Sequence, residues 1–271
     1  MSFKLISWNV NSLRSAIRQG FLDWLRAEKP DVLCLQEVRA TGEQLRSIEG
    51  QFEGYRAIWH PAERPGYAGV AVLTRVEPVG VELGLNGEAD PQGRSLTVDF
   101  GTFRVGSFYA PNADPGSPKI QIKEAWLRQF QKHLSVRVEK PFVIAGDLNV
   151  ACTALDSGGV AQPWGMNGCT DVERRELQVV FDRCGLFDPA RHEAGDALLS
   201  TWWDLPVTQR SFKNGMRYDY ILFQKKHQAL VMEQEILFHV DGSDHCPVSL
   251  TLDVSTDGLH RAETRGQGRL L

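Results

Sequence analysis

The sequence predicts an α/β (or α+β) protein in which mixed β-sheets are covered by helices. Short apolar runs bounded by Gly, Pro or Asp recur along the chain, as buried strands do. Segments with helical periodicity lie between these runs, and a Gly101-Thr102 pair suggests a hairpin. The two halves of the chain resemble each other loosely, which is compatible with a sandwich of two sheets but does not require one.

The predicted strands follow in order along the chain. They are Phe3–Trp8, Val32–Leu35, Gly69–Thr74, Phe103–Tyr109, Phe142–Ala145 and Tyr218–Phe223. In the last strand, Val248, Leu250, Leu252 and Val254 alternate with polar residues. That strand should therefore have one buried face and one solvated face.

Three apolar stripes with helical spacing lie between the strands. They consist of Ile17, Phe21, Leu22 and Leu25; of Ile122, Trp126, Phe130 and Leu134; and of Leu177, Val180, Phe181 and Cys184. Pro30 should end the first helix. Thr170 and Glu173 should form a capping box at the start of the third helix, and Gly185 should end it.

Composition excludes several classes of protein. The chain has 271 residues, 42% of them apolar and 24% charged, which is the balance of a soluble globular protein with a large core. It has no run of 18 apolar residues and no secretion signal, so we expect no membrane partner. A net charge of −4 argues against coating nucleic acid by bulk electrostatics, but allows a local basic rim. Five scattered cysteines, without a C-x-x-C pair, indicate reduced thiols in a cytoplasmic protein.

One domain is predicted over residues 1–254. Residues 255–271 lack apolar periodicity and are predicted to be a flexible tail. Its arginines, Arg261, Arg265 and Arg269, could touch phosphates, but a solvated tail is the simpler interpretation. We expect a monomer, because the sequence shows no oligomerisation motif.

Four polar clusters end or precede predicted strands, where active sites of α/β sheets gather. They are Ser7–Asn11, Leu35–Glu37, Ala145–Asn149 and Gly242–Pro247. Oxygen donors come from the side chains of Asn9, Glu37, Asp147, Asn149 and Asp244. Such a donor set suits Mg²⁺ or Mn²⁺, which can neutralise a phosphodiester and activate a water. His245 could polarise or protonate the phosphate, with Asp219 as the acid that fixes its tautomer.

Each cluster alone has an ordinary structural explanation. Asp147-Leu148-Asn149 after a strand is a common turn, and Ser243-Asp244-His245 could be a turn or a helix cap. The number and order of the clusters favour a hydrolytic site.

In these motifs the chain resembles the exonuclease III branch of the abasic-site (AP) endonucleases, within the endonuclease/exonuclease/phosphatase superfamily. The matching stretches lie at 7–11, 33–37, 66–73, 93–94, 109–112, 145–150, 173–174, 201–203, 217–220 and 242–248, in family order. The resemblance implies a four-layer sandwich of two mixed β-sheets flanked by helices. It also implies a Mg²⁺-dependent hydrolase of base excision repair, with Mn²⁺ as a possible substitute. Such an enzyme cuts double-stranded DNA 5′ of abasic sites, trims blocked 3′ ends, and associates with the nucleoid through DNA.

The resemblance also assigns roles to individual residues. Asn9, Glu37 and Asp244 match the metal site. Tyr109, Asp147, Asn149, Asp219 and His245 match the catalytic groups: Asp147 acts on the attacking water, Asn149 and Tyr109 contact the phosphate, and His245 with Asp219 stabilises its charge. Asn11, Asn112, Trp202, Trp203, Met216 and Arg217 match substrate contacts. The two tryptophans and Met216 are expected to line a pocket that admits an abasic sugar and excludes a base. The number of metals and the identity of the base stay open.

The chain departs from the family at a few positions. Arg39 stands where the family usually has Lys, Met216 where relatives often have Trp, and Asn11 where some have Asp. The segment 157–169 is also shorter than in many relatives. The stretch 205–215, with Arg210 and Lys213, is expected to face DNA, and Lys119 and Lys123 form a second candidate rim.

Three alternatives follow. The chain could be a 3′-end exonuclease without abasic-site incision, or a catalytically silent nucleic-acid-binding regulator. A silent relative should have lost metal or catalytic residues, and none is lost. A superfamily cousin acting on phosphoinositides, sphingomyelin or RNA tails shares the hydrolytic core, but the paired tryptophans favour DNA.

Overall fold

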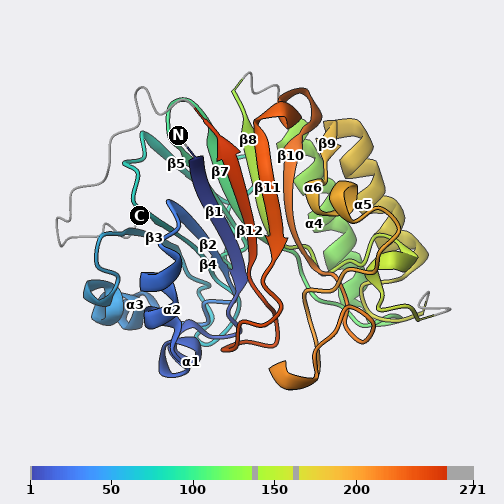
Figure 1. The fold of residues 1–271 in the computed structure, drawn as a ribbon, viewed down its shortest axis with the longest axis horizontal. Coiled ribbons are helices and arrows are strands. Elements are labelled where there is room, and N and C mark those ends of the chain that lie inside the picture. Colours follow the sequence, from blue (N-terminus) through green and yellow to red (C-terminus); the bar gives the residue numbers. More distant parts are fainter. Residues whose placement is uncertain (1, 136–139, 161–164, 255–271) are drawn as a thin grey trace.

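Two six-stranded sheets pack face to face, with helices on both outer surfaces (Figure 1). The computed structural model describes residues 2–135, 140–160 and 165–254. This architecture confirms the predicted four-layer sandwich of two mixed sheets flanked by helices. The predicted tail, 255–271, lies outside the described residues.

The first sheet has the order β11-β12-β1-β2-β4-β3. Its strands are β1 (Ser2–Asn9), β2 (Val32–Gln36), β3 (Arg56–His60), β4 (Val70–Thr74), β11 (Val231–Ile236) and β12 (Val248–Asp253). Only β1 and β2 run parallel, so both end at the same edge of the sheet. The helices beside its outer face are α1 (Leu13–Arg18), α2 (Phe21–Glu28) and α3 (Gly42–Ile48).

The second sheet has the order β5-β6-β7-β8-β10-β9. Its strands are β5 (Gly80–Leu83), β6 (Ser95–Asp99), β7 (Arg104–Tyr109), β8 (Phe142–Asp147), β9 (Leu186–Phe187) and β10 (Asp219–Gln224). Here β7 and β8 are the parallel pair. Its outer face packs against α4 (Lys119–Ser135) and α5 (Asp171–Cys184), and the short α6 (Pro189–Ala194) precedes β10.

The central core lies between the two sheets and is almost wholly apolar. It includes Leu5, Val72 and Ile221, all fully buried. One polar link crosses it near the strand ends: Gln36 Nε2 donates to Ser107 Oγ (3.0 Å), and Ser107 Oγ donates to the carbonyl of Leu35 (3.1 Å). This link ties the ends of β2 and β7 together, so the polar edges of both sheets meet.

Two of the three predicted helices need correction. The first is split, because Gly20 adopts a left-handed conformation (φ 96°) between α1 and α2. In α4 the predicted Ile122 is exposed, whereas Lys123 is buried on the face with Leu127 and Phe130. The third helix is confirmed as α5, including its capping box and its left-handed glycine cap.

Candidate active site

The predicted polar residues meet where strands of the two sheets end side by side. Asn9 ends β1, Glu37 follows β2, and Asp147 ends β8. Asp219 begins β10, directly opposite Asp147 in the antiparallel register. His245 lies in the loop before β12. The strands thus bring together residues from five distant parts of the sequence.

Asn9 is fully buried and bridges the two principal carboxylates. Its Nδ2 donates to Glu37 Oε1 (2.9 Å) and to Asp147 Oδ2 (2.8 Å). Its Oδ1 accepts from the backbone N–H of Asn11 (3.0 Å). Both ends of this amide are therefore engaged within the protein, and the contacts suit a residue that orients Glu37 and Asp147 better than a metal ligand.

Glu37 is held in a left-handed backbone conformation (φ 52°). The following residues are pinned to the neighbouring hairpin, because Val38 N–H donates to Gly69 O (3.0 Å) and Arg39 N–H donates to Ala68 O (2.9 Å). Arg39 forms an ion pair with Glu37 Oε2. At this position the family usually has Lys, and the guanidinium of Arg39 contacts the carboxylate of Glu37 here.

Asp147 and Asn149 form one hydrogen-bonded unit at the end of β8. The backbone N–H of Asn149 donates to Asp147 Oδ1 (2.8 Å). The Asn149 side chain donates to Asp147 Oδ2 (3.3 Å) and to Ala110 O (3.0 Å). Asn149 also has a positive φ of 52°, a strained conformation that clusters at functional sites.

His245 and Asp219 form the predicted acid–histidine pair. His245 Nδ1 lies 2.7 Å from Asp219 Oδ2, and His245 Nε2 lies 3.8 Å from Asp147 Oδ2. Both side chains are buried, and Asp219 Oδ1 has no hydrogen-bond partner among the described residues. This geometry fixes the ring and directs its second nitrogen towards Asp147.

These contacts shift two pKa values in the same direction. Burial raises the pKa of Asp147 to about 7, and the carboxylates of Asp219 and Glu37 add to this effect, while His245 opposes it. Burial alone would lower the pKa of His245, but the carboxylates of Asp219 and Asp147 outweigh it and raise that pKa to about 10. At neutral pH the imidazole is therefore a cation beside a carboxyl group that is poised to exchange a proton.

One cluster in the described residues could hold a metal ion. Ligand atoms of Glu37, Asp147 and His245 all lie within 4.8 Å of one another. Asp244, also predicted to be a ligand, is not in this group. Its Oδ1 accepts from Asn11 Nδ2 and its Oδ2 from Trp202 Nε1 (both 3.0 Å), so it lies beside the cluster and holds two neighbouring side chains.

Tyr109 lies next to the carboxylates at the end of β7, paired with Asp147 in the sheet register. Burial raises its pKa well above the ordinary value, and the charges of Glu37 and Asp147 raise it further. Arg94, which sequence reasoning did not assign, packs over its ring with the guanidinium carbon 4.6 Å from the ring centroid. The phenol therefore stays protonated and can donate. Asn112 is exposed and hydrogen-bonds to Asn167, which puts it at the rim.

Aromatic side chains border the cluster on the side of β10. Trp202 makes isolated bridge pairs with both Met216 and His245. Tyr218 packs against Trp202, with ring centroids 5.6 Å apart, and was not predicted as a pocket residue. Trp203 is fully buried, and its Nε1 donates to Ser211 O (2.8 Å). It therefore anchors the loop that follows it, and it also borders the groove beside the cluster. Its expected role as a pocket wall stays a prediction.

Three predicted DNA contacts are buried in this structure. Arg217 is 1% exposed and forms ion pairs with Asp156 and Asp188, so it does not reach the surface as expected. Lys123 is 0% exposed and therefore does not belong to a rim. Arg210 turns inwards to the carbonyls of Val240 and Ser243, while Lys213 on the same loop is exposed.

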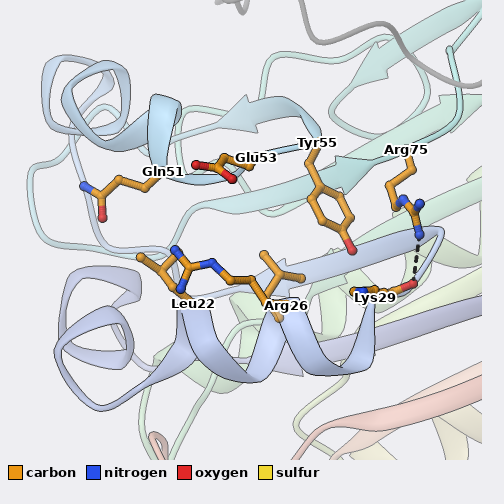
Figure 2. A pocket seen from close by; sticks show the side chains of 9 residues that line it. Leu22, Arg26, Lys29, Gln51, Glu53, Tyr55 and Arg75 are labelled. Carbon is orange, nitrogen blue, oxygen red and sulfur yellow. Dashed lines mark hydrogen bonds between the residues drawn. The ribbon is translucent and has the colours of Figure 1, made fainter.

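Two hollows differ in their relation to the cluster. An open groove of about 470 Å³ lies directly beside it, lined by Asn11, Asp244 and the loop from Trp203 to Arg210. A smaller hollow of about 180 Å³ lies between α2, which carries Leu22 and Arg26, and the segment that carries Glu53 and Tyr55 (Figure 2). None of the predicted site residues lines the smaller hollow, so the groove is the natural approach for a large substrate.

Comparison with known proteins agrees with this picture. Residues 6–245 match the model of the endonuclease/exonuclease/phosphatase family. An exodeoxyribonuclease of Bacillus subtilis is 34% identical over 93% of this chain and 100% of its own length. The DNA repair nuclease APEX1 of Danio rerio is also 34% identical, over 93% of this chain and 83% of its own. A solved structure of the 3′ phosphatase NExo from Neisseria, bound to a product DNA hairpin, superposes with a TM-score of 0.83 at 28% identity, covering 93% of this chain and all of that one.

Proposed function

The chain belongs to the endonuclease/exonuclease/phosphatase family, and we propose that it is a DNA-repair nuclease that cuts 5′ of abasic sites and processes 3′ ends. The observation that carries this proposal is the meeting of Asn9, Glu37, Asp147 and Asn149 with the His245–Asp219 pair at one edge. We propose residues 1–254 as the catalytic domain.

The donor set fits Mg²⁺, with Mn²⁺ as a substitute. Three buried carboxylates lie close together, and their mutual repulsion contributes to the raised pKa of Asp147. A cation relieves that repulsion. Glu37 offers a hard oxygen ligand of the kind that Mg²⁺ prefers, with the carboxylate of Asp244 close by. When bound, the ion would neutralise charge on the phosphate and lower the pKa of a water.

Asp147 is the proposed general base. Asn9, Asn149 N–H and the Asn149 amide together fix both of its oxygens, so the carboxylate has one orientation. With a pKa near 7 it can accept a proton from an attacking water at neutral pH. Both hydrogens of the Asn149 side-chain amide are already donated, to Asp147 Oδ2 and Ala110 O, so its Oδ1 is the atom that can accept a hydrogen bond from that water.

His245 and Tyr109 are the proposed donors to the phosphate. The high pKa of His245 keeps the ring positively charged, and Nδ1 of the ring is hydrogen-bonded to the Asp219 carboxylate. A fixed cation inside a dry site stabilises developing negative charge more strongly than it would in water. Tyr109 adds a neutral hydrogen bond, because its pKa lies well above its usual range.

Trp202, Met216 and Tyr218 are the proposed walls of the sugar pocket. Trp202 pairs with both His245 and Met216, and the three side chains pack in one apolar cluster. An apolar pocket of this kind accepts a base-free sugar more readily than a full nucleotide. The names of the two relatives and the NExo–DNA structure support double-stranded DNA with abasic sites or blocked 3′ ends as the partner.

The cellular setting is part of the proposal. The bacterial exodeoxyribonuclease supports a cytoplasmic location, associated with the nucleoid through DNA. Within the described ranges, no helix is long and apolar enough to cross a membrane. We propose that the enzyme acts as a monomer.

The direct test uses two end-labelled duplexes, each incubated with Mg²⁺ or with EDTA. One duplex carries a single stable abasic analogue, and the other is undamaged with a recessed 3′ end. A single Mg²⁺-dependent cut at the lesion that leaves a 3′-hydroxyl is the expected result. Only a ladder from the 3′ end would instead support an exonuclease without an abasic pocket. Binding without cleavage of either duplex would contradict the proposal in favour of a silent regulator.

A further inference from the structure

A buried cation lies directly behind the catalytic loop. Lys123 is 0% exposed, although its neighbours on the inner face of α4 are Leu127 and Phe130. Its ammonium forms an ion pair with Glu173, which is also fully buried. Its Nζ further donates to the backbone carbonyl of Asn149 at 2.7 Å. The Glu173 carboxylate, in contrast, forms its hydrogen bonds with Lys123 and Thr170.

The Asn149 carbonyl is confined from two sides. Lys123 holds it by a charge-assisted hydrogen bond, and Gly168 approaches so closely that a Cβ there would lie 2.6 Å from the oxygen. The backbone of Asn149 is in the left-handed region (φ 52°), which an asparagine tolerates but does not strongly prefer. The Lys123 contact therefore adds to the hydrogen bonds that Asn149 makes through its N–H and its amide in holding this conformation.

We propose that Lys123 is a positioning residue that holds the backbone of Asn149, and through it the amide that contacts Asp147. This inference rests on the proposed nuclease function. The ion pair alone does not explain the lysine, because a buried pair can often be replaced by apolar residues without loss of stability. Glu173 already has a separate structural role, since it accepts the backbone N–H and the hydroxyl of Thr170 in the capping box of α5.

Lys123 does not touch the reacting atoms, so its effect should pass through Asn149. Loss of the ammonium leaves a buried carbonyl unpaired and lets the 148–150 turn relax. A displacement of about 1 Å in a reacting group can cost about 100-fold in rate. Substrate affinity should change little, because no described contact of Lys123 reaches the groove or the aromatic pocket.

The test is a double-mutant cycle with Lys123→Met and Asn149→Ala on the abasic duplex. Alone, Lys123→Met should lower kcat by about 10- to 100-fold, with KM within about twofold of wild type. In the Asn149→Ala background the same substitution should lower kcat clearly less than it does alone, because the side-chain amide is gone and only the backbone N–H contact to Asp147 is left to position. Lys132→Met, on the exposed face of the same helix, is the matched control and should keep wild-type kcat.

Two results would overturn the inference. The first is wild-type kcat in folded Lys123→Met, and the second is a full multiplication of the two kcat losses in the double variant. If Lys123→Met does not fold, Lys123→Met/Glu173→Gln removes both charges, and the cycle is run with that pair. Failure of the wild-type enzyme to cleave DNA would instead contradict the proposed nuclease function. The experiment therefore distinguishes a wrong role for Lys123 from a wrong function for the protein.

Discussion

At the scale of single residues, the site combines an acid and a base whose pKa values are set by burial and by the neighbouring carboxylates. Asp219 and Asp147 raise the pKa of His245 to about 10, and burial with Asp219 and Glu37 raises that of Asp147 to about 7. From the sequence we could predict that His245 pairs with Asp219, because a histidine that donates a proton or hydrogen bond needs an acidic partner to fix its tautomer. The bridging role of Asn9 could not be predicted, since it depends on a 2.8 Å contact across 138 residues.

Asp219→Asn should make activity fall with rising pH where the wild type does not. In the wild type, His245 stays protonated up to about pH 10. Without the Asp219 carboxylate, burial should lower the His245 pKa from about 10 towards its usual value of about 6.5, although Asp147 and Asp244 still raise it. The cation then disappears at a lower pH than in the wild type. At pH 8 the variant should turn over at least about tenfold more slowly than wild type, and part of this loss should be recovered at pH 6.

The measurement is single-turnover cleavage of the abasic duplex between pH 5.5 and 9. Asp196→Asn removes an exposed carboxylate and serves as the control, with a wild-type profile. Parallel profiles for Asp219→Asn and wild type would show that the charge on His245 does not depend on Asp219.

At the scale of elements, the strands were more predictable than the loops that carry the chemistry. Buried strands can be recognised in the sequence as apolar runs. Seven strands were expected on this basis: β1, β2, β4, β7, β8, β10 and β12. The strands β3, β5, β6, β9 and β11 were missed, and β5 and β9 are short and only partly buried. The face of α4 was misassigned because Lys123 breaks the apolar stripe, and its burial depends on contacts with Glu173 and the Asn149 carbonyl that lie far away in the sequence.

Arg217 illustrates an element-scale correction that experiment can check. It joins the start of β10 to the 154–156 turn and to the N-cap of α6, through Asp156 and Asp188. Arg217→Met leaves both acids without this partner, and breaking a buried ion pair costs about 3–5 kcal/mol. We therefore expect a loss of that size in the free energy of unfolding in urea, with little change in DNA affinity of the folded protein.

Arg191→Met is the control for Arg217→Met. Arg191 pairs with the same Asp156, but its side chain is 20% exposed, so its loss should cost less stability. If Arg217→Met kept wild-type stability and bound DNA more weakly, the arginine would be a substrate contact after all.

At the scale of the whole molecule, the site exists because two sheets end at the same edge. The parallel pairs β1–β2 and β7–β8 bring Asn9, Glu37 and Asp147 to one side, and the register of β10 sets Asp219 opposite Asp147. Local patterns predicted that each strand ends in polar residues, but not which strands are neighbours. The resemblance to a known family supplied that long-range information, including the four layers. The resemblance also assigned Trp203 to the wall of the sugar pocket, and the side chain of this residue is fully buried here.

The most direct test of the account is the Asp147→Asn variant on the abasic duplex with saturating Mg²⁺. The substitution keeps side-chain volume but removes the proposed base. It leaves the groove and the aromatic pocket unchanged. We predict DNA affinity within about twofold of wild type and single-turnover cleavage slower by about 10²- to 10⁴-fold. Cleavage at a rate near that of wild type would remove Asp147 from the chemistry and contradict the assignment of this cluster as the active site.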